Sequence, residues 1–245
     1  MSIYAKTVRG LILLLVTLSL AGAAGAADKI RVLLVSGGHG YDVEQFNQMF
    51  ADNPDITVEK IQHPNAQAKF KPDAAKTYDV VVFYDMYQKI TDESKQDFVN
   101  LLKQGKGVVA MHHCLANYQD WPEWSKIVGG KYLLVKKGET NALASTYKHD
   151  VDFTVKVEKT SHPIIAGLSD FQTHDETYGK CVVNADVQPL LTTDEPTSTK
   201  TVAWCKQYEA SRIAYIMLGH DKVAYANPSF IKLVRQAIQW AAVKP

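Results

Sequence analysis

The sequence has little of the features that would place a chain in a specialised class. Its 245 residues carry 27 lysines and arginines against 26 aspartates and glutamates, so there is no basic field to hold a nucleic acid or an anionic surface. It contains no internal repeat, no low-complexity segment and no long run of one charge. These absences leave an ordinary globular protein without a nucleic-acid partner.

Long apolar runs are also scarce, and the one run present stands at the N-terminus. Two basic residues precede the apolar segment Leu11–Leu20, and Ala24-Gly25-Ala26 fits the small-x-small rule for signal cleavage. The run is too short to span a membrane comfortably, so we expect residues 1–26 to be a signal peptide, with an uncleaved anchor as the alternative. The remaining residues, 27–245, are expected to form one exported domain, periplasmic or secreted and free of the membrane.

Cysteine is rare as well, with three residues in the chain. In an oxidising compartment one pair can form a disulfide and one cysteine is left over. Cys181 and Cys205 lie in the same C-terminal region and are the expected pair, which leaves Cys114 as the odd thiol.

What is present is an alternation of buried strands and helices. Apolar runs of strand length recur at Ile30–Val35, Ile56–Gln62, Val80–Tyr84 and Gly107–Met111. Asp42 with Gln45 reads as a capping box for a helix to about Asp52, and Thr91 caps a second helix that ends at Gly105. This alternation predicts an α/β fold with a parallel sheet and helices on both faces.

The second half of the chain has a different pattern. Apolar and polar residues alternate over 151–157, as in a half-exposed strand. Val202–Tyr208 and Arg212–Leu218 are separated by three residues, which predicts a hairpin and a mixed sheet. Asn227-Pro228 begins a last helix with an apolar face, expected to pack on the sheet.

Polar, proton-active residues follow several of the predicted strands. In an open parallel sheet, ligands bind outside the carboxyl ends of the strands, so these residues are expected to share one edge. They are His39, Asp85, Tyr87, His112, His113, Cys114, His220 and Asp221. His112 and His113 are neighbours, so we expect one to face the cleft and the other to pack.

Other polar and aromatic residues carry weaker signals. The run His174-Asp175-Glu176, with Tyr178 nearby, groups proton-active side chains, and Glu176 is the expected participant in the site. His162 lies in the sequence Ser-His-Pro, which predicts a turn, and is expected to be structural, whereas His63 and His149 stand alone and are expected at the surface. Of the tryptophans, Trp121 could stack on a sugar ring and Trp124 is expected in the core.

Five stretches of the chain together resemble the trehalose-utilisation, or ThuA-like, family, which has the class I glutamine-amidotransferase-like fold. They are LLVSGGHGYD, GKGVVAMHHCLANYQDWPEWSKIVGGKY, SHPIIAGLSDFQTHDETY, IAYIMLGHD and FIKLVRQAIQWA. The resemblance covers about residues 30–243 and implies a flavodoxin-like three-layer α/β/α sandwich and a role in sugar metabolism. The chain departs from the family in the turn 208–211, where family members commonly have glycines.

The amidotransferase comparison bears on Cys114. Those enzymes hold a nucleophilic cysteine in a strained turn directly after a strand, between small residues. Here His112 takes that place, while Cys114 comes two residues later between His113 and Leu115, which are bulky. This arrangement favours a bystander role for Cys114.

We therefore expect a sugar-processing hydrolase, lyase or isomerase that acts on a glycoside or keto-sugar by acid–base chemistry. His112, His113, Glu176 and Asp85 are the expected catalytic groups. Tyr87, Trp121, Tyr178 and Asp221 are expected to bind the carbohydrate. A divalent metal such as zinc, held by His39, His112 and His220, would assist, although no HExxH-like spacing is present.

Two alternatives stay open. One is a cysteine amidohydrolase or amidotransferase-like enzyme that pairs Cys114 with His174 or His220. The other is a non-catalytic sugar-binding protein with an aromatic surface made of Tyr87, Tyr118, Trp121 and Trp124. The aromatic second half of the chain also leaves room for an oligomer interface.

Overall fold

The computed structural model describes residues 28–135, 138 and 140–243. The expected signal peptide lies outside these residues. None of the described helices is long and apolar enough to cross a membrane.

A nine-stranded mixed sheet runs through the molecule, in the order β2-β1-β3-β4-β11-β10-β9-β6-β7. The first five strands in this order pair in parallel with their neighbours among the five, and every later pair of neighbours is antiparallel. The parallel strands are β1 (Ile30–Gly37), β2 (Ile56–Gln62), β3 (Val80–Asp85), β4 (Gly107–Met111) and β11 (Ser211–Ile216). The antiparallel strands are β6 (Thr146–Val157), β7 (Phe171–Gly179), β9 (Gln188–Thr192) and β10 (Thr201–Tyr208), and β5 (Gly130–Lys131) pairs apart with β8 (Val182–Val183).

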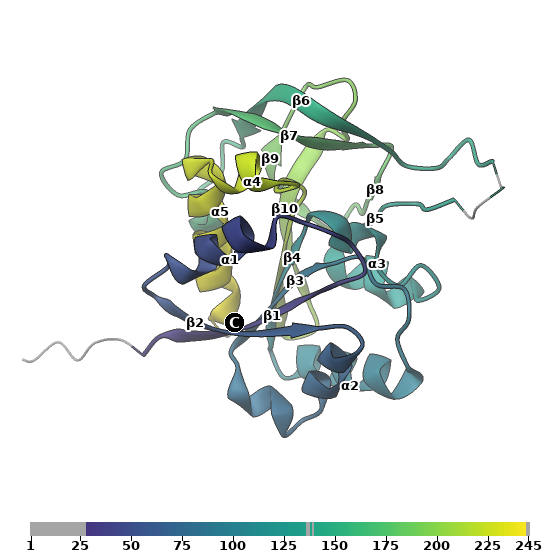
Figure 1. Cartoon of the computed structure of the whole chain (residues 1–245), viewed down its shortest axis with the longest axis vertical. Coiled ribbons are helices and arrows are strands. Elements are labelled where there is room, and N and C mark those ends of the chain that lie inside the picture. The colour runs from purple at the N-terminus through teal and green to yellow at the C-terminus, as the bar shows by residue number, and fades with distance from the viewer. Residues whose placement is uncertain (1–27, 136–137, 139, 244–245) are drawn as a thin grey trace, which may run out of the picture.

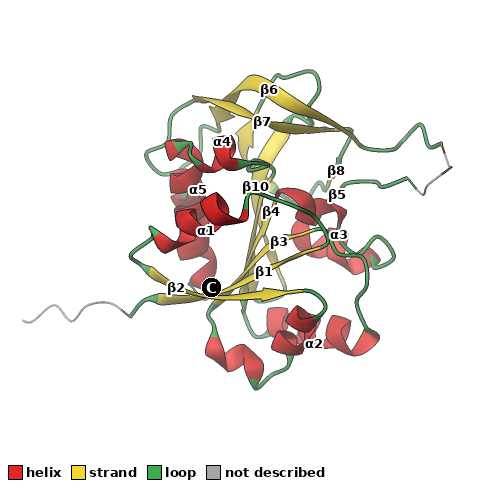
Figure 2. Cartoon of the chain, viewed as in Figure 1, coloured by secondary structure: helices red, strands yellow, loops and turns green. Residues whose placement is uncertain are grey.

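Helices cover both faces of the parallel part of the sheet (Figure 1). On one side lie α1 (Val43–Ala51), α4 (Lys222–Tyr225) and α5 (Pro228–Ala242), and on the other lie α2 (Asp92–Lys103) and α3 (Pro122–Val128). Short 3-10 turns join them: η1 (Asn65–Phe70), η2 (Ala74–Thr77), η3 (His112–Ala116) and η4 (Pro163–Ile165). The three layers seen in Figure 2 confirm the expected flavodoxin-like sandwich.

Burial on both faces explains why the central strands read as continuous apolar runs. Every residue of β3 and β4 is buried, as parallel strands between two helical layers must be. Gly107 opens β4 where α5 passes closest, since a Cβ there would lie 1.9 Å from the Ala241 carbonyl oxygen. The glycine thus lets the last helix pack directly on the sheet.

Helix capping follows the sequence at two of three places. Thr91 accepts a hydrogen bond from the Ser94 amide, and Asn227 accepts one from the Ser229 amide, as expected. The prediction of a capping box at Asp42 was wrong, because the Asp42 side chain makes no capping hydrogen bond and instead accepts one from the Lys222 amide of α4. That carboxylate joins α1 to α4.

The hairpin between β10 and β11 is tighter than expected. Its turn holds two residues, and β11 begins at Ser211, whose hydroxyl donates to the carbonyls of Leu102 and Lys106. Glu209 adopts the left-handed conformation, with φ of 51°, at the turn where the family resemblance led us to expect glycines. The strand ends at Ile216, before Met217 and Leu218.

The expected disulfide is not formed, and all three cysteines are free thiols. Cys205 lies within β10, where its sulfur faces His162 Nε2 at 3.5 Å. Cys181 follows β7, and its amide donates to the Thr199 hydroxyl. The two residues are held by different neighbours, so proximity in sequence was a poor guide to pairing.

Candidate functional site

The site is built around a strained residue at the end of β4. His112 has φ of 49°, in the left-handed region that non-glycine residues rarely adopt. The Tyr215 hydroxyl donates to the His112 carbonyl at 2.8 Å, and His112 Nδ1 lies 2.5 Å from the Met217 carbonyl oxygen. Since a carbonyl can only accept, Nδ1 carries the proton, which directs Nε2 toward the site.

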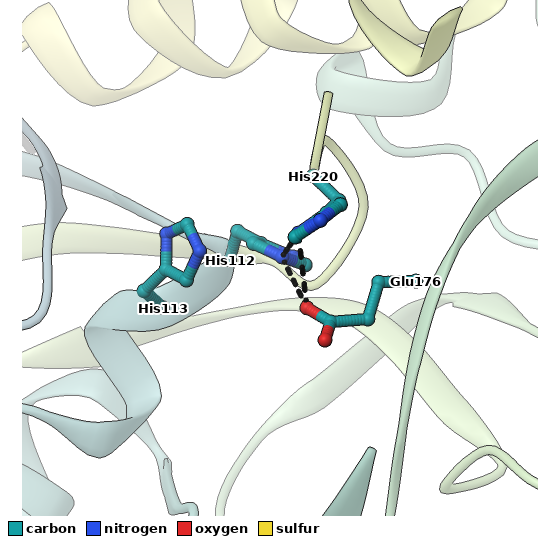
Figure 3. A group of neighbouring side chains, drawn as sticks. All are labelled: His112, His113, Glu176 and His220. Carbon is teal, nitrogen blue, oxygen red and sulfur yellow. Dashed lines mark hydrogen bonds and ion pairs between the residues drawn. The ribbon is translucent and has the colours of Figure 1, made fainter. Parts of the chain in front are cut away.

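This nitrogen is one of three ligand-type atoms, from three parts of the chain, that lie close together (Figure 3). His112 Nε2 lies 3.0 Å from Glu176 Oε2 and 3.3 Å from His220 Nδ1, and the last two atoms are 3.1 Å apart. The Tyr178 hydroxyl is also 2.9 Å from His112 Nε2. The ends of β4 and β11 and the middle of β7 therefore supply one compact triad, which we call the His112–Glu176–His220 triad.

His113 joins the triad to form a group of four residues that could hold a metal ion, with ligand atoms all within 4.8 Å of one another. Both adjacent histidines contribute ligand-type atoms to this group, although of the two His113 alone lines the pocket described below and His112 is fully buried. The strand ends at Met111, so the alternation of a strand does not apply to the turn η3. His113 is 3 % exposed, and neither of its ring nitrogens has a hydrogen-bond partner among the described residues.

The buried setting controls the charges of the group. Burial, with His112 beside it, lowers the pKa of His113 well below its usual range, so this ring stays neutral and its lone pair stays available. Burial alone would raise the pKa of Glu176, but hydrogen bonds from His112 and His220 outweigh it and hold the pKa well below its ordinary value. The hydrogen bond with Glu176 raises the pKa of His220.

Asp175 holds the His220 loop in place. Its carboxylate is buried and accepts hydrogen bonds from the amides of Gly219 at 2.7 Å and His220 at 2.9 Å. Gly219 has φ of 103°, and a Cβ there would lie 2.5 Å from the Phe230 ring, so the loop needs glycine. Sequence reasoning saw Asp175 only as part of a polar run and missed this positioning role.

A pocket of about 230 Å³ opens beside the group, at the carboxyl ends of the parallel strands as expected. It is lined by His39, Met86, His113, Ala116, Tyr132, Leu134, Tyr147, His149, Glu176 and Tyr178. His39 was expected as a metal ligand, but it stands outside the four-residue group. Its ring stacks on His113 with centroids 3.9 Å apart, and its Nδ1 faces the Gly40 carbonyl.

Asp85 belongs to a second buried cluster rather than to the triad. Its carboxylate accepts from Asn117 Nδ2 at 2.7 Å and from the Cys114 thiol at 3.2 Å, and it pairs with His63 Nε2 at 2.9 Å. The His63 side chain is fully buried and also meets the Tyr118 hydroxyl, so the prediction that His63 is a surface residue was wrong. We call these residues the Asp85 cluster.

Three of the four residues expected to bind substrate lie elsewhere. Tyr87 and Trp121 line a separate groove of about 650 Å³, and the Tyr87 ring stacks on His63. Asp221 caps α4 by accepting from the amides of Val223 and Ala224. Of the four, Tyr178 alone lines the pocket of the triad.

The aromatic surface of the sugar-binding alternative is largely absent. Tyr118 and Trp124 are each 2 % exposed, and Trp124 donates its indole N–H to the Cys114 carbonyl. Both rings belong to the core. Trp124 was expected there, and the sugar-binding alternative had placed both rings on an exposed surface.

The cysteine alternative also finds little support in the geometry. The Cys114 side chain is fully buried, and burial beside Asp85 raises the pKa of its thiol well above the usual range. The expected partner His174 instead pairs with Asp152 at 2.9 Å. His162 is structural, as predicted, because its Nδ1 accepts from the Ile164 amide and begins η4.

Comparison with known proteins now decides the family. A family model described as trehalose utilisation, ThuA, matches residues 31–241. The chain belongs to the ThuA family. Its description places the family in carbohydrate metabolism. Among curated proteins, none matches this ThuA-like chain.

Solved structures share the fold at low identity. A ThuA-like protein from Parabacteroides merdae is 20 % identical with a TM-score of 0.72, over 88 % of this chain and 91 % of that chain. One from Bacteroides uniformis is 18 % identical with a TM-score of 0.70, over 90 % and 94 %. A β-galactosidase from Bacillus circulans sp. alkalophilus is 12 % identical with a TM-score of 0.58, over 89 % of this chain and 32 % of the enzyme. At these identities the likeness concerns the fold alone.

Proposed function

We propose that this ThuA-family protein holds a divalent transition-metal ion on the His112–Glu176–His220 triad and acts on a sugar or keto-sugar by acid–base chemistry. The observation that carries the proposal is the spacing of the three ligand atoms, which lie 3.0, 3.1 and 3.3 Å from one another. Ligand atoms about 2.0–2.1 Å from a tetrahedral zinc ion lie roughly 3.3–3.4 Å apart.

The contacts of the triad support a cation at its centre, which would replace the protons that His112 and His220 share with Glu176. His112 Nδ1 donates to a backbone carbonyl, the arrangement by which metal-binding histidines are usually fixed, and this leaves Nε2 as a donor of electrons. The carboxylate of Glu176 has a depressed pKa and stays charged. Two imidazoles and one carboxylate, with neutral His113 beside them, form a set of borderline and hard ligands that suits zinc and similar ions.

The surroundings of the triad support catalysis rather than a purely structural ion. Structural zinc sites are closed by four protein ligands, whereas catalytic sites keep a position open. Here the triad borders a pocket that reaches solvent and that Glu176 and His113 both line. A bound ion would polarise a substrate oxygen or lower the pKa of a water molecule. The Tyr178 hydroxyl, buried and kept protonated by its raised pKa, stands beside the triad as a hydrogen-bond donor.

Metal content tests the proposal. Mature protein purified without a histidine tag is analysed by mass spectrometry beside His112→Ala/His220→Ala and a matched double variant, His162→Ala/His174→Ala. We expect about one equivalent of metal in the wild type and the matched variant, and none in the triad variant. Absence of metal after incubation with zinc, manganese and nickel would contradict the proposal and leave His112 and Glu176 as a metal-free acid–base pair.

Turnover tests the chemistry. Glycosides and keto-glycosides are offered to the wild type before and after removal of metal by a chelator. We expect product formation that stops with the chelator and returns with added metal. Sugar binding without turnover in any of these conditions would favour the non-catalytic alternative.

We also propose that the chain is exported after cleavage behind Ala26, because residues 1–26 have the charge, apolar run and small residues of a signal peptide. N-terminal sequencing of the protein recovered outside the cytoplasm tests this. A mature N-terminus at Ala27 is expected, and an intact Met1 would contradict it.

A further inference from the structure

One irregularity interrupts the pairing of β6 with β7. The register is regular up to the pair Lys148–Thr177 and resumes at the pair Val151–Asp175. Between these pairs, His149 and Asp150 together oppose the single residue Glu176. This is a β-bulge, and Asp150 within it adopts φ of 56°. The bulge is therefore centred on the carboxylate of the triad.

The bulge changes which side chains of β6 face the pocket. Cross-strand partners share a face of the sheet, and neighbours along a strand alternate. Tyr147 pairs with Tyr178 and shares its pocket-facing side, whereas Val151 pairs with Asp175 on the opposite side. Without the extra residue, odd-numbered side chains of β6 would all face one way. The bulge lets Val151 enter the core while Tyr147 and His149 face the pocket.

His149 is held at the open side of the triad. Its Nδ1 lies 3.3 Å from Glu176 Oε1, the oxygen that does not contact His112 or His220. Its ring centroid lies 4.8 Å from that of His220. The side chain is half exposed and stands outside the four-residue group, so its second ring nitrogen is free to meet a ligand in the pocket.

Tyr147 lies beside His149 on β6 and lines the same pocket. It is 61 % exposed although it lines the pocket, and its ring lies edge-on to His149 with centroids 5.2 Å apart. An aromatic ring left uncovered beside a pocket has a face available for a ligand. The face of an aromatic ring is slightly negative and attracts the weakly positive C–H groups on the apolar face of a sugar.

The volume of the pocket limits what can enter. The pocket of about 230 Å³ is smaller than the 300–1,000 Å³ typical of sites for drug-sized ligands. This size suits one six-membered ring with its hydroxyls, and a second linked ring would extend toward solvent.

We propose that the β6 bulge forms a recognition wall for a single sugar ring, with Tyr147 stacked on the ring and His149 hydrogen-bonded to one of its hydroxyls. The substrate class is then a monosaccharide, or the terminal unit of a glycoside whose remainder stays outside. This inference rests on the proposed function, which places sugar chemistry at the adjoining triad.

Calorimetry on the metal-loaded, tag-free protein tests the wall. The probes are the methyl glycosides of glucopyranose, galactopyranose and mannopyranose, and the disaccharides maltose, lactose and trehalose. We expect at least one methyl glycoside to bind, and Tyr147→Ala to weaken it roughly fivefold to tenfold. Tyr147→Phe keeps the ring and the affinity. Leu143→Ala removes another exposed side chain, outside the pocket, and should change nothing.

The remaining variants and probes sharpen the result. His149→Ala should weaken binding, and His149→Gln should restore part of it, because the glutamine amide places a polar atom near the position of Nε2. A disaccharide that contains the bound sugar should bind no more than about threefold tighter than its methyl glycoside, since one ring makes the contacts.

Three results would overturn the recognition wall: equal affinity of the wild type and Tyr147→Ala, a disaccharide bound more than about threefold tighter than the methyl glycoside, or no binding of any probe by metal-loaded wild type. Metal content is measured on the same samples. A wild type without metal overturns the proposed function, and the Tyr147 comparison still decides the wall, because it reports sugar binding directly.

Discussion

Two buried histidine–carboxylate clusters lie in the described part of the chain, and they differ in their ligand-type atoms and in their access to a pocket. In the Asp85 cluster, Oδ1 accepts hydrogen bonds from Asn117 Nδ2 and the Cys114 thiol, and Oδ2 lies 2.9 Å from His63 Nε2. In the triad, His112 Nε2, His220 Nδ1 and the charged carboxylate of Glu176 are crowded within 3.3 Å, and neutral His113 adds unpartnered nitrogens. Neither cluster is fully hydrogen-bonded, because Asp85 Oδ2 and His63 Nδ1 also lack a hydrogen-bond partner among the described residues. The difference is that the triad and His113 bring four ligand-type atoms together within 4.8 Å.

This difference separates a structural network from a binding site. A buried carboxylate with enough donors rigidifies the fold and needs no ligand. A convergent set of imidazole nitrogens and a carboxylate can instead exchange the protons that they share for a metal cation, because metal binding releases protons from its ligands. The pocket agrees with this division, because it is lined by His113 and Glu176 and by no member of the Asp85 cluster. Burial and charge alone would not have told the two apart.

Breaking the Asp85 cluster gives the largest expected effect on stability. Asp85→Ala leaves His63 and Asn117 buried without their partner, and it should lower the free energy of unfolding by about 3–5 kcal/mol. Denaturant unfolding of the metal-free protein measures this, with Glu176→Gln as the comparison. Metal content should be unchanged in Asp85→Ala. A variant that keeps its stability, or loses its metal, would show that the two clusters are not separate.

Completing the triad gives the next largest effect. A metal at a free concentration 100-fold above its Kd should raise the free energy of unfolding by about 2.7 kcal/mol, because it binds only the folded chain. Thermal unfolding with and without metal measures the gain. His112→Ala/His220→Ala should abolish the gain, and Asp85→Ala should retain it. An equal gain in all three proteins would place the metal elsewhere.

The sequence predicted well which residues lie at the carboxyl edge of the sheet, but it did not predict which of the two clusters each residue joins. Strands β2 and β4 have the predicted bounds, and the strand-end rule brought His112, His113 and His220 together. The same rule covers His63, which follows β2 directly, so its burial beside Asp85 was within reach. Which cluster each carboxylate joins depends on side-chain packing between loops, and no local pattern encodes that.

His149 is a second residue whose position the sequence alone does not predict. Alternation over residues 151–157 correctly predicted a half-buried strand, but a bulge is a change of register between two strands. Its signal lies in the pairing of β6 with β7, which are distant in sequence. A single sequence therefore leaves His149 as an isolated histidine, and the paired strands place it beside Glu176.

A smaller effect is expected from Asp175, which supports the triad without belonging to it. Asp175→Asn turns one oxygen that accepts a backbone N–H into an amide that cannot accept, so the His220 loop loses a hydrogen bond. We expect metal affinity to fall about 10-fold to 100-fold, as for other groups that orient metal ligands. Asp221→Asn is the matched control, since asparagine caps a helix as well as aspartate does. Equal affinities in the two variants would remove the positioning role.

The smallest effect is expected from Cys114, the thiol of the Asp85 cluster. Burial raises the pKa of Cys114 well above the usual range, and it raises the pKa of Cys181 and of Cys205 to about 11. A raised pKa means less thiolate at a given pH. At pH 8.5 a free cysteine is about half ionised, whereas a thiol of pKa about 11 is ionised to under about 1 %.

Alkylation followed by peptide mass spectrometry therefore tests whether this thiol can act as a nucleophile. We expect slow labelling at pH 8.5, with partly exposed Cys181 ahead of the others and Cys114 unlabelled until the protein unfolds. Cys114→Ala should keep both metal and turnover, because the sulfur acts within the Asp85 cluster, donating to the Asp85 carboxylate and accepting from the Asp85 amide, while Asn117 and His63 remain beside that carboxylate. Rapid labelling of Cys114 in the folded protein, together with loss of turnover in Cys114→Ala, would move the chemistry from the triad to the Asp85 cluster. Retained turnover would leave the cluster with its structural role.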